Sequence, residues 1–330
     1  MKLIYYKGAH PNFGDDLNAL LWPRLEPSLF EADDSQGFLG IGTIIGMKAE
    51  GVSRLHVFSS GVGYSPLTGG PQDRRLWCVR GPLSARQLGA DDNVALTDGA
   101  ILSPRVLPAP ATAGPPVVVP HWETMLAGGW ENACAQAGFT LIDPMLPPQA
   151  VIPAIAAAPL VITESLHGAI IADTYGVPWV AFATTGNFST FKWLDWTRSI
   201  QAPLRVHLVP PPDAAAILRF GRSPLGGWGT LAKPDEAVAM AEFEIRSRPA
   251  AAPAPPSAAE RLKATAKAVV RDTPMLKSLL GYNATRTAEA LGQLASEAPT
   301  LSDAAHRDRL ADDMSERLRR LAREQVGYAA

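Results

Sequence analysis

The strongest constraint on the fold comes from residues 160–182, which read LVITESLHGAIIADTYGVPWVAF. The segment begins with an apolar, β-branched run at Leu160–Thr163, which is typical of a buried strand. Apolar residues then recur at helical spacing, and Gly176 is placed to end that helix. A second apolar run, Trp179–Phe182, follows directly. The segment therefore predicts a strand–helix–strand (βαβ) unit.

The turn between this strand and this helix carries polar residues. In α/β sheets such a turn lies at the carboxyl end of a strand, where ligands bind. Ser165 is a suitable helix N-cap, and the unpaired amides of the first helical turn favour an anion. We expect Ser165 and Leu166 to contact a ligand, Gly168 to leave room for it, and His167 to act on it as a general acid. A purely structural His167 is the alternative.

The same alternation of strands and helices extends towards both ends of the chain. Such alternation predicts a mainly parallel, doubly wound sheet. Before the βαβ unit, the expected strands are Leu3–Tyr6, Phe38–Ile41, Arg54–Phe58, Leu76–Val79, Val94–Thr97, Val117–Val119 and Thr140–Ile142. The expected helices cover residues 15–25, 82–88, 122–138, 149–157, 189–200, 213–220, 234–246 and 302–325, the first starting at Asp15 or Asp16.

Two proline-rich breaks divide this pattern. A chain of 330 residues is long enough for two α/β domains. The first break, Pro104–Pro116, is expected to link them. The second lies among alanines and prolines after Arg248 and is expected to be a linker or disordered. We therefore predict an N-terminal Rossmann-like domain (1–105), a C-terminal Rossmann-like domain that contains the ligand-binding motif at Ser165–Gly168 (115–246), a Pro/Ala linker (247–257) and a helical tail (258–330).

Composition excludes several classes of protein. A net charge of −2 argues against a nucleic-acid-binding protein, because such proteins bind phosphates through a strongly basic surface. The two cysteines, Cys78 and Cys134, lie in apolar surroundings without metal-ligand spacing, so we expect buried thiols and no metal site. No apolar run is long enough to span a bilayer, and the N-terminus has no signal-peptide core. A cytoplasmic location is expected.

Further candidate binding residues follow other predicted strands. Arg80 comes directly after a strand, where its guanidinium can grip a carboxylate or phosphate bidentately. Ser60 and Gly61 lie in a short Gly-containing loop that could bind an anion. Lys192 belongs to a predicted helix whose Trp193 and Trp196 could be core residues or could stack on a sugar.

The loop after the first strand carries a second set of candidates, Asn12, Asp15 and Asp16. A carboxylate here could accept a proton from an acceptor hydroxyl or orient a sugar. Helix capping by one of the aspartates is an equally good interpretation. The sequence does not distinguish Asp15 from Asp16 as the active one.

Several of these segments resemble one enzyme family. The chain resembles the polysaccharide pyruvyl transferases in a set of segments that occur in the same order. These segments are ESLHGAIIAD followed by GVPWVAF, together with residues 12–18, 40–44, 60–63, 79–84 and 192–196. The resemblance covers about residues 1–210. The exopolysaccharide ketal pyruvyl transferases, of the succinoglycan type, are the most similar branch.

The resemblance implies both a fold and an activity. The fold is GT-B-like, with two Rossmann-like domains facing a cleft. The activity is transfer of pyruvate from phosphoenolpyruvate to a sugar of a lipid-linked oligosaccharide, forming a cyclic ketal, in the cytoplasm of a bacterium. His167 corresponds to the family's proposed catalytic histidine, and Arg80 to its donor-binding arginine. Neither a cofactor nor a metal is required. The alternatives are a nucleotide-sugar glycosyltransferase and a non-catalytic scaffold of polysaccharide assembly.

The tail carries a basic amphipathic stretch, residues 257–282. It could lie on an anionic membrane surface, which would suit a lipid-linked acceptor. Packing against the protein itself or against a partner is the alternative.

Overall fold

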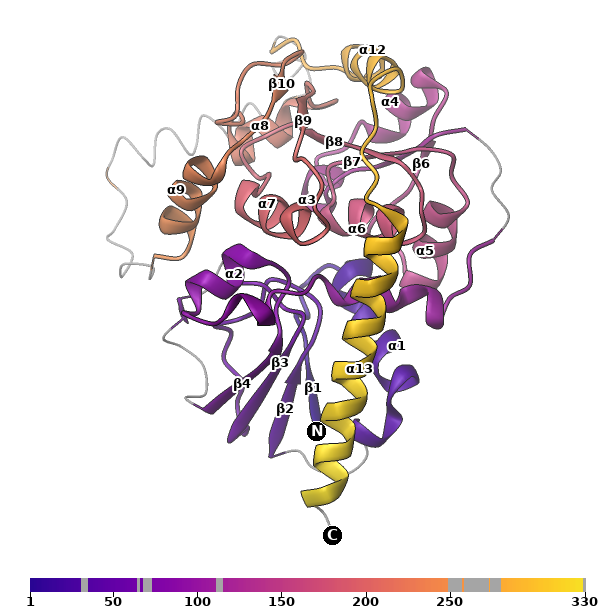
Figure 1. Ribbon diagram of the computed structural model, residues 1–330. Coiled ribbons are helices and arrows are strands. Elements are labelled where there is room, and N and C mark those ends of the chain that lie inside the picture. Colours follow the sequence, from indigo (N-terminus) through magenta and orange to yellow (C-terminus); the bar gives the residue numbers. More distant parts are fainter. Residues whose placement is uncertain are drawn as a thin grey trace.

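The computed structural model describes residues 1–30, 35–63, 66–67, 73–110, 115–248, 257, 273 and 280–328, without the side chains of 326–328. Within these residues the strands form a four-stranded and a six-stranded sheet, which occupy opposite halves of the molecule (Figure 1). Helices surround both sheets, and a helical segment ends the chain. The predicted α/β class is therefore confirmed, with two parallel-strand sheets and a helical C-terminal segment.

The N-terminal sheet is entirely parallel and follows chain order. Its strands are β1 (Lys2–Ile4), β2 (Gln36–Leu39), β3 (Arg54–Phe58) and β4 (Asp73–Cys78), paired as β1-β2-β3-β4. The helices of this half are α1 (Phe13–Leu25) and α2 (Pro82–Gln87), and the 3-10 helices are η1 (Pro27–Phe30), η3 (Asp92–Val94) and η4 (Gly99–Arg105).

The second sheet reverses its order, as a doubly wound sheet does. Its strands are β5 (Val117–Val119), β6 (Thr140–Leu141), β7 (Val161–Thr163), β8 (Trp179–Ala183), β9 (Val206–Leu208) and β10 (Leu231–Ala232). They pair as β10-β9-β8-β7-β5-β6, with β10 antiparallel. The order reverses between β5 and β7, so the carboxyl ends of these two strands open on the crevice where such sheets bind ligands.

The predicted βαβ unit is present. Ser165 caps α6 (Leu166–Thr174), since its Oγ accepts a hydrogen bond from the Gly168 amide at 3.3 Å. Gly176 follows the helix at φ +71°, a left-handed conformation that glycine adopts without steric cost. The other helices of this half are α3 (Trp122–Met125), α4 (Trp130–Ala137), α5 (Pro148–Ala156), α7 (Thr190–Ser199), α8 (Ala214–Phe220) and α9 (Glu236–Arg246).

Three predictions about local structure were wrong. The helix expected over residues 122–138 is interrupted between α3 and α4, where Gly128 and Gly129 adopt positive φ. Helix α1 starts at Phe13 rather than at Asp15 or Asp16, because the extended Asn12 accepts the Gly14 amide at 3.1 Å and is the N-cap. Residues 94–97 do not form a strand. Asp92 and its neighbours instead form η3, and only a single bridge joins Ala95 to Val79. Asp and Asn favour such local turns over a strand.

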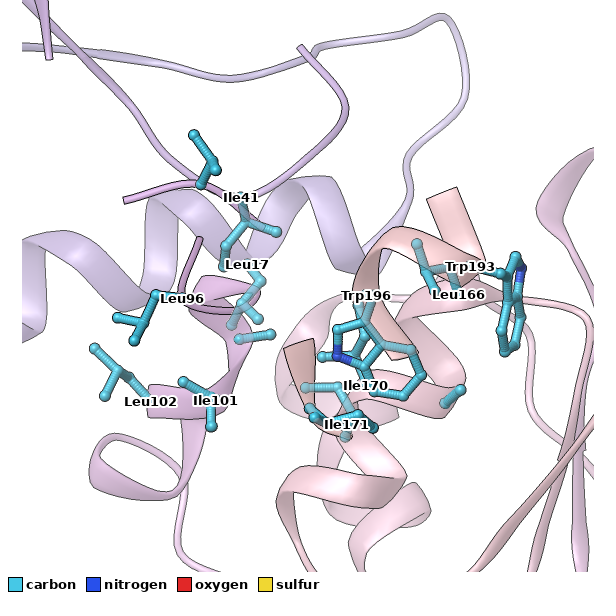
Figure 2. Packing of buried hydrophobic residues seen from close by; sticks show 14 of the residues in the cluster. Leu17, Ile41, Leu96, Ile101, Leu102, Leu166, Ile170, Ile171, Trp193 and Trp196 are labelled. Carbon is cyan, nitrogen blue, oxygen red and sulfur yellow. The ribbon is translucent and has the colours of Figure 1, made fainter. Parts of the chain in front are cut away.

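One apolar core joins the two halves. Side chains from the N-terminal half meet side chains from α6 and α7 of the second half (Figure 2). The labelled N-terminal residues are Leu17, Ile41, Leu96, Ile101 and Leu102, and those of the second half are Leu166, Ile170, Ile171, Trp193 and Trp196. Because this contact is apolar and continuous, it fixes the position of one sheet relative to the other.

The C-terminal helices pack on both halves. Helix α12 (Ala284–Leu294) lies against α4, and α13 (Ala304–Tyr328) runs from the second half along the N-terminal sheet (Figure 1). Asp173 of α6 anchors the chain before α13, since it accepts the Ser302 amide at 2.9 Å. Further along α13, Arg317 donates to the Trp77 carbonyl at 2.7 Å. The end of the chain thus bridges α6 and β4.

Two of the predicted segments cannot be compared with the structure. The linker at 247–257 and the basic stretch at 257–282 lie largely outside the described residues, as do 111–114 of the first break. None of the helices in the described part of the chain combines the length and apolar composition needed to cross a bilayer.

Asn18 of α1 is a structural residue whose loss we expect to destabilise the fold. Its buried amide donates to the carbonyls of Asp15 (2.9 Å) and Ile41 (3.0 Å). Its Oδ1 accepts Trp22 Nε1 and the Ile41 amide, both at 2.8 Å. Asn18→Ala would leave these buried groups unpaired, so urea unfolding should show a loss of about 2–4 kcal/mol. The variant Asn93→Ala, at an exposed position, is the control, and equal stability of the two variants would contradict the expectation.

Candidate functional site

A cavity of about 380 Å³ lies between the two halves, at the carboxyl ends of β5 and β7. Its volume falls in the range of small-molecule sites, about 300–1,000 Å³. Both halves contribute to its wall. Seven of the residues predicted from sequence line it: Asn12, Asp15, Arg80, Ser165, Leu166, His167 and Lys192.

His167 lies in the first turn of α6, and its side chain is 13% exposed. A Cβ on Gly14 would come 1.9 Å from its Nδ1, so this close approach of α1 to the ring requires glycine. Burial, with the positive charges of Lys192 and Arg80, lowers the pKa of His167 to about 3. The imidazole is therefore neutral at pH 7 in the ligand-free protein, and a nearby anion is needed to favour its charged form.

Arg80 enters the cavity wall from the N-terminal half, held by a buried ion pair. Its Nε lies 3.1 Å from Oδ2 of Asp195 on α7, and the two side chains are 1% and 0% exposed. Nη1 donates to Thr43 at 2.7 Å, and Nη2 to the Val62 carbonyl at 3.4 Å. Three of the five guanidinium N–H groups are thus engaged by described residues, which leaves two for a ligand.

Asp15 and Lys192 bring opposite charges to the same cavity. Burial raises the pKa of Asp15 to about 7, although the charge of Lys192 opposes this shift. Lys192 also lowers the pKa of both His167 and His121, although burial is the larger cause for each. One ammonium group therefore acts on titratable side chains from three elements of the wall. A carboxyl group with a pKa near 7 can donate or accept a proton at neutral pH.

The amino end of α6 adds anion-binding groups. Ser165 Oγ accepts only the Gly168 amide, and the amides of Leu166 and His167 form no hydrogen bond within the described residues. These unpaired donors and the helix dipole both favour a negative charge beside Ser165. A carboxylate or phosphate in the cavity would meet them together with Arg80 and Lys192.

Four predicted site residues do not line the cavity. Asp16 lies on another side of α1, and the buried Ser60 hydroxyl donates to the Gly40 carbonyl. Gly61 leaves space for the guanidinium group of Arg80, because a Cβ at position 61 would lie 2.4 Å from Cζ of Arg80. Gly168 makes no room for a ligand. A Cβ on it would lie 2.4 Å from Thr163 Oγ1, so it allows α6 to pack on β7.

The aromatic residues of the wall differ from those considered in the sequence. Trp193 and Trp196 are 2% and 1% exposed and belong to the core. Instead Tyr6, which is 49% exposed, and the half-buried Trp122 line the cavity. Trp122 follows β5 as His167 follows β7. Its position after Val117–Val119 was therefore the signal that could have identified it.

His121 lies two residues after β5 and also lines the cavity, where it caps α3 by accepting the Glu123 amide at 3.3 Å. The neighbouring Glu164 is buried, and it accepts Thr124 Oγ1 at 2.5 Å and the Thr184 amide at 2.7 Å. Burial raises the pKa of Glu164. This carboxyl group therefore ties the turns after β5, β7 and β8 together, which fixes the wall of the cavity.

No cluster of three or more His, Cys, Asp or Glu side chains suited to a metal ion occurs among the described residues. The groups that converge on the cavity are two imidazoles, two carboxyl groups, of which that of Asp15 has a raised pKa, and two cations. They can bind an anionic ligand and exchange protons with it.

Comparison with known proteins shows the family of this chain. The profile of the polysaccharide pyruvyl transferase family matches residues 78–186, which include Arg80, His121 and His167. The succinoglycan biosynthesis protein ExoV of Rhizobium meliloti (strain 1021) is 34% identical over 230 residues, covering 67% of this chain and 72% of that protein. The chain therefore belongs to the polysaccharide pyruvyl transferase family, and it is an enzyme.

Proposed function

We propose that this enzyme transfers pyruvate from phosphoenolpyruvate to a sugar of an exopolysaccharide repeat unit and forms a cyclic ketal. The observation that carries the proposal is the convergence of His167, Arg80 and Lys192 on one cavity. Phosphoenolpyruvate bears a carboxylate and a phosphate on three carbons. Arg80, Lys192 and the amino end of α6 offer separate partners for these two anionic groups.

In the proposed reaction C3 of the enol gains a proton, and C2 forms two bonds to acceptor oxygens. The bond from C2 to the phosphate oxygen breaks. The two acceptor hydroxyls release two protons, of which one replaces the proton given to C3 and the other leaves with phosphate. His167 is the proposed acid, because a bound phosphate would raise its pKa from about 3. Asp15 is the proposed acceptor of a hydroxyl proton.

The acceptor sugar is proposed to stack on Trp122, on the cavity wall near Tyr6 and Glu123. We expect Trp122→Ala to raise the acceptor KM about 3- to 10-fold, because an aromatic contact is worth about 0.5–1.5 kcal/mol. The KM for phosphoenolpyruvate should stay the same. Trp228→Ala is the control, since Trp228 packs against Tyr282 outside the cavity. Steady-state kinetics with each substrate varied would test this, and an unchanged acceptor KM would contradict it.

Incubation of the protein with phosphoenolpyruvate and candidate lipid-linked oligosaccharides tests the proposed reaction. Mass spectrometry should show the pyruvylated acceptor, and phosphorus NMR an equal amount of free phosphate. A parallel incubation with nucleotide sugars tests for a glycosyltransferase. Sugar transfer, or the absence of any product from phosphoenolpyruvate across the acceptors, would overturn the proposal.

We also propose that residues 257–282 bring the enzyme to the membrane that carries the acceptor. The basic residues of this stretch support the proposal, because anionic headgroups attract them. Sedimentation with anionic and neutral vesicles would test it, for the full chain and for a full-length variant with Arg261, Lys263, Lys267, Arg271 and Lys277 replaced by glutamine. Equal sedimentation of the two proteins with anionic vesicles would contradict it.

A further inference from the structure

Two buried polar atoms lie close to each other beside the cavity, and neither has a hydrogen-bond partner among the described residues. One is Oδ2 of Asp98, and the other is Nε2 of His167. They lie 3.9 Å apart, and Asp98 is 1% exposed. A buried polar atom without a hydrogen bond lowers the stability of a fold. Two such atoms this close to each other therefore call for a functional explanation.

Asp98 is held rigidly in this position. It is the N-cap of η4, and its Oδ1 accepts the Ala100 amide at 3.0 Å. This bond leaves Oδ2 turned towards α6, which packs directly on η4. The carboxyl group therefore presents one oxygen to His167 and does not itself line the cavity.

The two nitrogens of His167 have different surroundings. Nε2 is closed off from solvent and faces Asp98. Nδ1 lies beside Gly14 and is absent from the closed-off atoms without a partner, and it forms no hydrogen bond with the described residues. Since His167 lines the cavity, Nδ1 is the nitrogen that a ligand there can reach.

We propose that Asp98 accepts the Nε2–H of His167 and thereby keeps Nδ1 as the nitrogen that exchanges protons with the ligand. The separation of 3.9 Å needs to close by about 1 Å to form the bond, and such bonds are often long in ligand-free sites. Asp98 is thus a positioning residue, acting through His167. This inference rests on the proposed function only for the identity of the ligand.

The charges around the pair fit this role. Arg80 and Lys192 face the imidazole as cations, and Asp15 lines the same cavity from α1. Burial raises the pKa of Asp98 to about 6 and lowers that of His167 to about 3. At pH 8 the pair is therefore a carboxylate and a neutral imidazole. When the imidazole gains a proton at Nδ1, the carboxylate balances its charge. Transfer of this proton to the substrate returns the pair to a carboxylate and a neutral imidazole.

Asp98→Asn tests the inference with almost no change in volume. If the oxygen of the substituted amide keeps the bond to Ala100, the amide N–H groups face Nε2 and favour the tautomer protonated at Nδ1. We expect kcat to fall about 10²- to 10⁴-fold, as for loss of a general acid–base group, with the KM for phosphoenolpyruvate unchanged. Asp235→Asn is the control, because Asp235 also caps a helix, α9, but forms no hydrogen bond or ion pair with a histidine among the described residues.

Nitrogen NMR of histidine-labelled protein at pH 8 gives a readout that needs no substrate. We expect the Nε2–H tautomer of His167 in the wild type and in Asp235→Asn, and the Nδ1–H tautomer in Asp98→Asn. An Nδ1–H tautomer in the wild type would overturn the inference, even if Asp98→Asn failed to fold. A wild type that shows the expected tautomer but does not release phosphate from phosphoenolpyruvate would instead count against the proposed function.

Discussion

Replacing His167 with alanine is expected to lower the kcat of pyruvyl transfer about 10²- to 10⁴-fold, the usual contribution of a general acid–base group. The ring lies on the cavity wall and forms no hydrogen bond with the described residues, so the fold should remain. His167→Gln should lose as much, because an amide cannot carry the proton. Phosphate release in the presence of acceptor oligosaccharide measures both variants.

The control for His167 is a histidine outside the cavity. His207 lies on β9, and His207→Gln should retain the wild-type kcat. Circular dichroism would verify that each variant is folded. Wild-type turnover by His167→Ala or His167→Gln would remove His167 from the proposed mechanism, whatever its similarity to the family's motif.

Replacing Asp195 with asparagine is expected to destabilise the protein by about 3–5 kcal/mol, because it leaves the buried charge of Arg80 without a partner. Asp195 also accepts two bonds at the start of α2, from the amide (2.9 Å) and hydroxyl (2.6 Å) of Ser84. The Asp195 carboxylate, from the second half of the molecule, thus binds both Arg80 and the start of α2 in the N-terminal half. Urea unfolding of wild type and variant would measure the loss.

An exposed ion pair provides the matched control. Arg54 and Asp73 lie 2.7 Å apart with side chains 44% and 53% exposed, so Asp73→Asn should cost at most about 1 kcal/mol. Similar losses for Asp73→Asn and Asp195→Asn would contradict the argument from burial. The double variant Arg80→Met with Asp195→Leu should recover only part of the stability, because the buried Ser84 loses its acceptor. It should also lose activity, because the apolar pair no longer offers a guanidinium to the ligand.

The sequence predicted the elements that local rules govern. The βαβ unit at 160–182 has the expected N-cap at Ser165 and the expected terminating glycine at Gly176. Hydrophobic periodicity and capping depend only on neighbours along the chain, so they were readable there. The same rules misassigned the start of α1, since Asn12 and Asp15 are both good caps and only the extended backbone of Asn12 distinguishes them.

The candidate site was predictable where residues follow strands. Arg80 lies two residues after β4, and His167 lies in the first helical turn after β7; both line the cavity. Asp98 and Asp195 could not be assigned from sequence, because what makes each notable is a partner about 70 or 115 residues away. Trp122 was not predicted as a site residue, because apolar composition alone does not distinguish an aromatic residue of a cavity wall from one of the core.

The amino-acid sequence by itself determined the α/β class, the placement of most strands and helices, and the family to which the chain belongs. Only the tertiary structure decided that α6 meets η4, which sets Asp98 opposite His167, and that α7 meets α2, which sets Asp195 against Arg80. Local patterns record which face of an element is apolar. They do not record which two apolar faces pack together, and that packing brings the charged groups of this site within reach of each other.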